Sequence, residues 1–186
     1  MANGVSSGTI VTPVGPLIVR GAQASDLDVV FEILEEAEAW LTSKGIDQWT
    51  PGVHRQYAQR FADAIDQGFV FVAGRRDGQI AAVVVLSWSG GKLWPAPQDD
   101  AGYVSKLAVR RDLSGHGVGL ALLRWAERLA ISVGKKYVRL DCLAGNHRLC
   151  QYYVDAGYRP KGEVDAHGYR LRLYEKCVLS GFGTSP

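Results

Sequence analysis

The chain has 186 residues, of which 47% are hydrophobic and 22% are charged, and its formal net charge is +2. This length and composition are typical of a globular protein with one domain and a sizeable core. The small, scattered positive charge argues against a nucleic-acid partner, and no apolar stretch is long enough to predict a membrane span.

The cysteines and the two ends of the chain indicate where the folded domain lies. Three widely spaced cysteines make a poor disulfide framework and a poor zinc site, so we expect reduced thiols, a cytoplasmic location and no metal. They are Cys142, Cys150 and Cys177. Residues 1–16 lack the basic start and apolar run of a secretion signal, so we expect a flexible arm there. The single domain then covers residues 17–178, and residues 179–186 form a flexible tail.

In the first half of the chain, residue spacing predicts a strand, two helices and a pair of strands. Apolar residues from Leu27 to Leu41 recur at three- and four-residue steps, which is typical of one helical face, and Gly45 ends this helix. A turn at Asp77 and Gly78 predicts a hairpin between the two strands. In chain order, these elements are expected at residues 17–19, 27–41, 57–67, 69–73 and 79–88.

The second half predicts a long loop followed by strands that alternate with helices. The loop, residues 89–100, contains two adjacent glycines, two prolines and two aspartates, and its length suggests a function beyond connection. The later elements are expected at residues 102–109, 118–133, 137–143, 146–156 and 169–177, with a further strand near Tyr158. Helices interleaved with strands place the chain in the α/β or α+β class.

A glycine-rich turn between a strand and a helix, Ser114–Gly119, is the segment with the clearest chemistry. The first turn of a helix has N–H groups without internal partners and a positive dipole end, and glycine lets an anion approach the backbone. The turn therefore predicts an anion site that needs no basic side chain. It lacks the lysine of a P-loop and the glycine spacing of a dinucleotide fold. From these residues alone, a tight turn that binds nothing is equally open.

A second block of residues follows in the C-terminal half. The strand Val138–Cys142 leads to Asn146, Tyr153 comes seven residues later, and Gly157–Tyr158 ends the helix. Together with the glycine turn, this pattern resembles the GNAT superfamily of N-acetyltransferases. The resemblance covers about Leu17–Lys176 and is strongest in the C-terminal half.

The glycine turn matches the family's acetyl-CoA loop at its glycines. That loop has Gln or Arg, two residues, Gly, one residue, then Gly or Ala; here Ser114 stands in the first position, and Gly117 and Gly119 match. The resemblance implies a mixed, mostly antiparallel central sheet of six to seven strands, flanked by about four helices. It also implies a splayed pair of parallel strands, residues 102–109 and 137–143, which opens a slot for the thioester.

The resemblance implies acetyl-CoA as the acyl donor and assigns residues to each part of it. Backbone groups of one strand pair with the pantetheine arm, N–H groups of the glycine turn hold the pyrophosphate, and Asn146 hydrogen-bonds the arm. His116 is exposed or lies near a phosphate, since no partner ligands for a metal lie at matching spacing. The implied cofactor-binding residues are Leu107, Ala108, Val109, Ser114, Gly115, His116, Gly117, Val118, Gly119, Leu120, Asn146 and Tyr153.

Acetyl transfer needs a proton acceptor for the amine and a proton donor for the departing thiolate. The resemblance implies that Tyr153 is the general acid, and a core tyrosine is the alternative. Asp141, five residues before Asn146, is either a base, acting directly or through a water, or a carboxylate that orients the amine. Family members often carry an acidic residue or a histidine on the cofactor strand. This chain has Tyr103 and Ser105 there, which we expect to line the amine pocket.

The first two helices and their loop shape the acceptor pocket in this family. Here Trp40 and Trp49 form either an aromatic wall of that pocket or part of the core. Glu32 and Glu36 are expected on a solvated helix face. The loop at residues 89–100 is long enough to roof a pocket, which favours a small-molecule amine as the acceptor.

Three other functions stay open. A protein or peptide N-acetyltransferase would have an open groove in place of the roof. A non-catalytic acyl-CoA-binding protein would use the cofactor site as a sensor or scaffold. An unrelated nucleotide-binding module is disfavoured by the glycine spacing. Edge strands in this fold often pair between subunits, so a homodimer is also left open.

Overall fold

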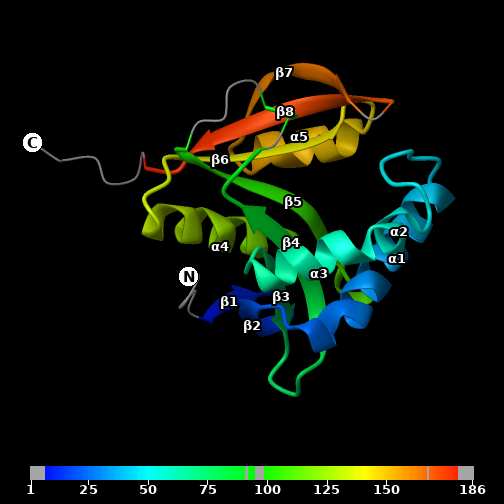
Figure 1. The fold of residues 1–186 in the computed structure, drawn as a ribbon, viewed down its shortest axis with the longest axis vertical. Coiled ribbons are helices and arrows are strands. Elements are labelled where there is room, and N and C mark those ends of the chain that lie inside the picture. The colour runs from blue at the N-terminus through cyan, green and yellow to red at the C-terminus, as the bar shows by residue number, and fades with distance from the viewer. Residues whose placement is uncertain (1–6, 91, 95–98, 167, 180–186) are drawn as a thin grey trace, which may run out of the picture. The chain divides into compact units, whose positions relative to one another are not determined.

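The computed structural model describes residues 7–90, 92–94, 99–166 and 168–179 (Figure 1). The strands in these residues are β1 (Gly8–Thr12), β2 (Gly15–Gly21), β3 (Val70–Gly74), β4 (Ile80–Ser87), β5 (Ala101–Val109), β6 (Tyr137–Leu143), β7 (Arg159–Ala166) and β8 (Tyr169–Cys177). The α-helices are α1 (Leu27–Ser43), α2 (Val53–Gln56), α3 (Ala58–Asp66), α4 (Val118–Ser132) and α5 (His147–Asp155). Two short 3-10 helices lie at Ala24–Asp26 and Arg111–Leu113.

The eight described strands follow one another in the sheet order β1-β2-β3-β4-β5-β6-β8-β7. β5 and β6 run parallel, whereas β1–β2, β2–β3, β3–β4, β6–β8 and β7–β8 are antiparallel. The expected mixed, mostly antiparallel sheet with a parallel pair is therefore confirmed. Among the described residues it has eight strands and five α-helices, where six to seven strands and about four helices were expected.

The chain folds into two compact units, and β5 belongs to both. The first unit contains the residues up to Leu86 together with Lys106–Trp125. The second contains Ser87–Ser105 and the residues from Ala126 onward. Each unit has a hydrophobic core of its own.

The core of the first unit joins α1 and α3 to the valines of β3 and β4. Phe31 and Leu34 lie on the buried face of α1, as the three- and four-residue spacing predicts, and they pack with Phe61 and Ile65 of α3. Phe31 and Phe61 meet edge to face, with ring centroids 5.3 Å apart. Aromatic pairs prefer this arrangement because the ring edge is positive and the ring face is negative.

Residues 8–12 lie within the segment expected to be an arm, and they form β1, which pairs with β2. Side chains alternate along this strand, since Ile10 is 2% exposed and Val11 is 84% exposed. At the turn into β2, Gly15 has a φ of +101° and Thr12 Oγ1 donates to the Gly15 carbonyl at 2.6 Å. The alternation is short and lies among Gly, Ser and Thr, so it is a weak signal in the sequence.

The helix expected at residues 57–67 is α3, and a short further helix, α2, lies just before it, where no helix was expected. Tyr57 has φ −107° and ψ 31°, outside the helical region, and its side chain is exposed. Phe61 and Ile65, expected on the same face, are buried. The four-residue spacing of these side chains therefore locates α3, whereas the four residues of α2 are too few to show a helical period.

The second unit is built on β6, β8 and β7, with α5 packed beside β6 and β7 (Figure 1). β6 pairs with β8 along its whole length. The parallel pairing of β5 with β6 covers Ala101–Tyr103 of β5 and ends there, although both strands continue. A short parallel contact of this kind is what a splayed strand pair requires.

Replacing Leu34 by alanine tests the core of the first unit. The side chain is fully buried between α1 and its neighbours, so we expect the Leu34→Ala variant to lose about 2–5 kcal/mol of unfolding free energy, measured by urea denaturation. Val11→Ala is the control, because Val11 is exposed, and it should change stability by about 0.5 kcal/mol or less. Equal losses in the two variants would contradict this placement of the core.

Candidate functional site

The glycine-rich turn lies in the first unit, between the 3-10 helix Arg111–Leu113 and α4. Gly115 has a φ of +83° and Gly117 a φ of +76°, a region that side chains with a Cβ rarely adopt. A Cβ on Gly115 would meet nothing within 4 Å, and one on Gly117 would meet only the Pro13 ring at 3.6 Å. The backbone conformation, rather than crowding, therefore requires glycine, and the turn is open to solvent at both positions.

The start of α4 leaves N–H groups available to an anion. The N–H of Ala121 donates to the Gly117 carbonyl at 3.0 Å, which is the hydrogen bond that joins the helix to the turn. The N–H groups of Val118, Gly119 and Leu120 come before that of Ala121 in the chain. The first turn of a helix offers such groups no internal acceptor. The helix dipole adds positive potential at this end. These groups suit an anion such as a phosphate, and the pyrophosphate site stays a prediction.

β5 is distorted just before the residues expected to bind the pantetheine arm. Lys106 has a φ of +51°, a left-handed conformation that costs a residue with a Cβ about 1–2 kcal/mol. Leu107, Ala108 and Val109 follow it, and Ala108 is buried in the core of the first unit. β5 continues along β4, since the N–H of Arg110 donates to the Ala81 carbonyl at 2.9 Å.

Tyr153, the expected general acid, lies on α5 in the second unit and is buried. Its ring packs against those of Tyr152, Tyr158 and Tyr174, with centroid distances of 5.6, 6.2 and 5.7 Å. Burial raises the pKa of Tyr153 well above the usual phenol value, and the nearby Cys142 thiol adds to the shift. The phenol is therefore protonated at neutral pH and has a proton to donate.

Asn146 caps α5. Its Oδ1 accepts a hydrogen bond from the N–H of Leu149 at 3.2 Å, and the residue is buried. An N-cap side chain satisfies one of the N–H groups that the first helical turn leaves open. The structure thus gives Asn146 a structural role beside the cofactor contact that the family resemblance implies.

Asp141, the expected base, lies on β6 opposite Leu173 of β8 and is half-buried. The next residue, Cys142, is fully buried, and its Sγ lies 3.7 Å from that of Cys150 on α5. Burial raises the pKa of the Cys142 thiol. The thiol is therefore protonated at neutral pH, and both cysteines are free and pack as small buried side chains.

The two tryptophans expected near the acceptor are half-buried in the first unit, and each stacks with a cation. The Arg111 guanidinium lies 4.2 Å from the centre of the Trp40 ring, and Lys106 Nζ lies 5.7 Å from that of Trp49. Both distances are typical of cation–π contacts. Neither ring belongs to a core cluster of fully buried side chains, although Trp49 packs against one.

Glu32 and Glu36, expected on a solvated face of α1, bind Arg110. Arg110 donates to Glu36 at 2.5 Å and to Glu32 at 3.1 Å, and its Nε donates to the Ile80 carbonyl at 3.0 Å. The expectation of free, solvated carboxylates was therefore incomplete. Because the pairing joins residues more than seventy positions apart, helix periodicity gives no sign of it.

The other two expected acceptor residues, Tyr103 and Ser105, lie on the part of β5 that belongs to the second unit. Tyr103 is buried against Trp94, and its hydroxyl accepts a hydrogen bond from Arg139 at 2.9 Å. Ser105 is exposed. A cavity of about 320 Å³ nearby is lined by Trp94, Asp100, Tyr137, Arg139, Lys161, Leu173 and Glu175. The expected roof at residues 89–100 lies partly outside the described residues, at 91 and 95–98.

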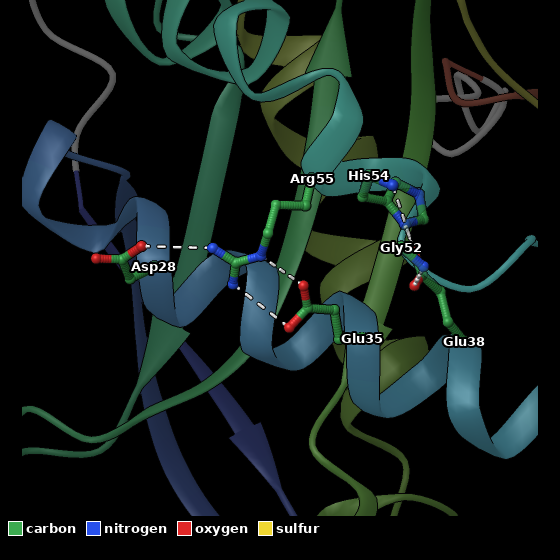
Figure 2. Close-up of polar contacts among 6 residues, drawn as sticks. All are labelled: Asp28, Glu35, Glu38, Gly52, His54 and Arg55. Atoms are coloured by element: carbon green, nitrogen blue, oxygen red, sulfur yellow. Dashed lines mark hydrogen bonds and ion pairs between the residues drawn. The ribbon is translucent and has the colours of Figure 1, made fainter.

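The sequence reading missed a buried pair of ionisable side chains, Glu38 and His54. Glu38 lies on α1 and His54 on α2, and the His54 ring nitrogen Nδ1 contacts a Glu38 carboxylate oxygen (Figure 2). The signal in the sequence was the position of Glu38, which follows Leu34 by four residues and precedes Leu41 by three. A charged residue on the apolar face of a helix must find a buried partner.

Beside this pair, Arg55 links α2 to two carboxylates of α1. It donates to Glu35 at 2.6 Å and lies 3.8 Å from Asp28 (Figure 2). The Arg55 guanidinium also lies 5.0 Å from the centre of the Phe31 ring. These contacts fix α2 on α1 and so hold His54 in place.

The described part of the chain has neither a metal-binding cluster nor a membrane-spanning helix. No cluster of three or more His, Cys, Asp or Glu side chains there is arranged to hold a metal ion. Within the same ranges, every helix is too short or too polar to span a lipid bilayer.

Known proteins resemble this chain in sequence and in fold. The sequence matches the acetyltransferase (GNAT) family over residues 31–158. The uncharacterized N-acetyltransferase YesJ of Bacillus subtilis (strain 168) is 32% identical over 160 residues, which cover 83% of this chain and 87% of that protein. A GNAT-family acetyltransferase structure from Listeria monocytogenes has a TM-score of 0.78 and 25% identity, and covers 91% of this chain and 99% of that one. The yncA structure from Salmonella typhimurium, determined with its cofactor acetyl-CoA, has a TM-score of 0.62 and 15% identity, and covers 91% and 97%.

Replacing Asn146 tests its role as a helix cap. We expect Asn146→Ala to lower the unfolding free energy by about 1 kcal/mol, because the Leu149 N–H loses its acceptor. Asn146→Asp should stay close to the wild-type value, since aspartate caps as well as asparagine. Urea unfolding of both variants is the measurement, and an aspartate variant as unstable as the alanine variant would contradict the cap.

Proposed function

The chain belongs to the acetyltransferase (GNAT) family, and we propose that it moves the acetyl group of acetyl-CoA to a primary amine, that of a small molecule. It is an acyltransferase, as its family and its relatives are. One observation carries the proposal: an open glycine turn, with two left-handed glycines, precedes the free N–H groups of a long helix. The likeness in fold to yncA, which binds acetyl-CoA, supports it.

We assign the parts of acetyl-CoA to the residues that the family resemblance implies. The N–H groups of residues 115–120 bind the two phosphates, and Ser114 and His116 flank them. The backbone of Leu107–Val109 pairs with the pantetheine arm, and Asn146 hydrogen-bonds it. The exposure of the turn and the left-handed φ of Gly115 and Gly117 support the phosphate assignment.

The chemistry needs two proton transfers and no acyl-enzyme, because the thioester is already activated. The amine nitrogen forms a bond to the carbonyl carbon, the carbon–sulfur bond breaks, and the nitrogen loses a proton. We propose that Tyr153 donates a proton to the leaving thiolate, the role that the family resemblance implies, since the phenol is protonated at neutral pH. The base is Asp141, acting directly, or an ordered water.

We propose a small primary amine as the acceptor, with Trp40, Trp49, Tyr103 and Ser105 as acceptor-binding residues. The half-buried tryptophans and the length of the loop at residues 89–100 support this choice. A peptide amine is the alternative within the same chemistry. A non-catalytic acyl-CoA-binding protein would bind the donor without turnover.

Binding of acetyl-CoA tests the phosphate site. Acetyl-CoA at a hundred times its Kd should stabilise the protein by about 2.7 kcal/mol, seen as a rise in melting temperature. Gly117→Trp should abolish the shift, because the side chain fills the phosphate position. Gly78→Trp is the matched control, since Gly78 also has a left-handed φ, +91°, but lies in the β3–β4 turn, and it should keep the shift. An undiminished shift in Gly117→Trp contradicts the phosphate site.

Removal of one hydroxyl tests the general acid. Tyr153→Phe should lower kcat at least about a hundredfold, the lower end for general acid catalysis, with little change in acetyl-CoA affinity. Tyr152→Phe is the control from the neighbouring position and should keep kcat. The assay measures free thiol released from acetyl-CoA in the presence of an amine. Wild-type kcat in Tyr153→Phe would show that another group protonates the thiolate.

A further inference from the structure

The Glu38–His54 pair is a buried charged pair of the first unit that the proposed mechanism does not use. Glu38 is 1% exposed and His54 is 2% exposed. The Glu38 carboxylate accepts hydrogen bonds from the N–H of Gly52 at 2.6 Å and of His54 at 3.4 Å, in addition to the contact with His54 Nδ1. The carboxylate is therefore anchored by the α1–α2 connection and acts on the imidazole from a fixed position.

This contact decides which nitrogen of His54 carries the proton. An ionised carboxylate only accepts hydrogen bonds, so Nδ1 must be the donor to Glu38. In the neutral imidazole the other nitrogen, Nε2, then has a free lone pair. Orientation of a histidine by a carboxylate on its far nitrogen is how proteins prepare an imidazole to accept a proton.

Nε2 of His54 is buried and has no hydrogen-bond partner among the described residues. An unmatched buried polar atom costs about 1–3 kcal/mol, and native proteins keep few of them. Burial lowers the pKa of His54, and the charge of Lys106 lowers it further, against the opposing effect of Glu38 and Glu35. The ring is therefore neutral at neutral pH, and the lone pair of Nε2 is available.

His54 lies close to the strand expected to hold the acyl donor, within the same unit. Its ring packs edge-on against Trp49 with centroids 4.7 Å apart, and the ammonium of Lys106 lies 5.7 Å from the centre of the same Trp49 ring. Lys106 directly precedes Leu107–Val109. Trp49, an expected acceptor residue, thus connects the imidazole to the start of that segment.

We infer that His54, oriented by Glu38, is the proton acceptor for the acceptor amine; this rests on the proposed acetyl transfer. The amine displaces the half-buried Trp49 ring and donates a hydrogen bond to Nε2. As the nitrogen–carbon bond forms, the proton passes from nitrogen to Nε2, and the Glu38 carboxylate stabilises the imidazolium. The carbon–sulfur bond breaks, and the leaving thiolate takes its proton from the general acid. Proton exchange with solvent then restores both side chains, so atoms and charges balance over one turnover.

His54 then takes the role of the general base, which the proposed function leaves open between Asp141 and an ordered water. The same role explains why Glu38 occupies a position on the apolar face of α1, where a leucine would pack more simply. The groups that face the imidazole are Glu38 and Glu35 from α1 and Lys106 from β5, with Arg55 beside it on α2. These four charged groups set the electrostatic environment in which the His54 imidazole gains or loses its proton.

The test is the pH dependence of kcat for the full-length chain with acetyl-CoA. The acceptor probes are benzylamine, putrescine, lysine and a short peptide, and released thiol is the readout. We expect the wild-type kcat to fall on the acidic side with an apparent pKa below about 6.5, the ordinary imidazole value. His54→Gln should lower kcat about 10²–10⁴-fold and remove this acidic limb. Glu38→Gln should move the limb to lower pH, because the carboxylate that favours the imidazolium is gone.

Two control variants separate catalysis from structure. His147→Gln replaces an exposed histidine and should keep both kcat and the limb. Asp141→Asn should keep the limb if His54 is the base. A purely structural role for His54 would lower the melting temperature and kcat while the limb stays, and that result overturns the inference. So does an acidic limb that Asp141→Asn removes and His54→Gln retains.

Two further readouts cover variants that fail to fold and acceptors that fail to react. In ¹⁵N-histidine NMR of the wild-type protein, His54 should carry its proton on Nδ1 at neutral pH, and a proton on Nε2 overturns the inference. If acetyl-CoA does not raise the melting temperature of the wild-type protein, the proposed function itself is overturned. If the wild-type protein shows the melting shift with acetyl-CoA and turns over, and His54→Gln leaves kcat and the acidic limb unchanged, only the role of His54 is overturned.

Discussion

The N–H groups at the start of α4 have no carbonyl within the helix to bind, and the rest of the candidate site depends on this constraint. The chain keeps these groups accessible by placing Gly115 and Gly117 in left-handed conformations directly before the helix. The turn follows β5, so the same segment that could bind phosphates continues from the strand assigned to the pantetheine arm. One local backbone arrangement therefore sets where an acyl donor can lie.

Much of the fold and the family could be predicted from the sequence, because the informative residues act locally. The apolar face of α1 follows from spacing alone, and the glycines before α4 require special backbone angles wherever they occur. β1 was missed because its alternation is short and lies among Gly, Ser and Thr, and α2 was missed because its four residues are too few to show a helical period. Both errors concern segments of four or five residues, which are too short to show a clear hydrophobic periodicity.

The site was less predictable, because its polar contacts join distant parts of the chain. Glu32 and Glu36 appeared to be solvated, yet Arg110 from beyond β5 binds both. Glu38 reads as one more member of an acidic run, and only the approach of α2 places His54 against it. Periodicity identifies a buried position, but the partner that a buried charge meets depends on packing, which the sequence does not state directly.

Recognition by main-chain atoms makes tolerance to substitution uneven along the turn. The N–H groups are the same whichever side chains occupy positions 116, 118 and 120, whereas Gly115 and Gly117 cannot be replaced without backbone strain. An exposed side chain such as His116 can vary more freely than the buried Val118, and Ser114 stands where the family has Gln or Arg. A turn of this kind can therefore keep its backbone geometry while the residues between its fixed glycines change.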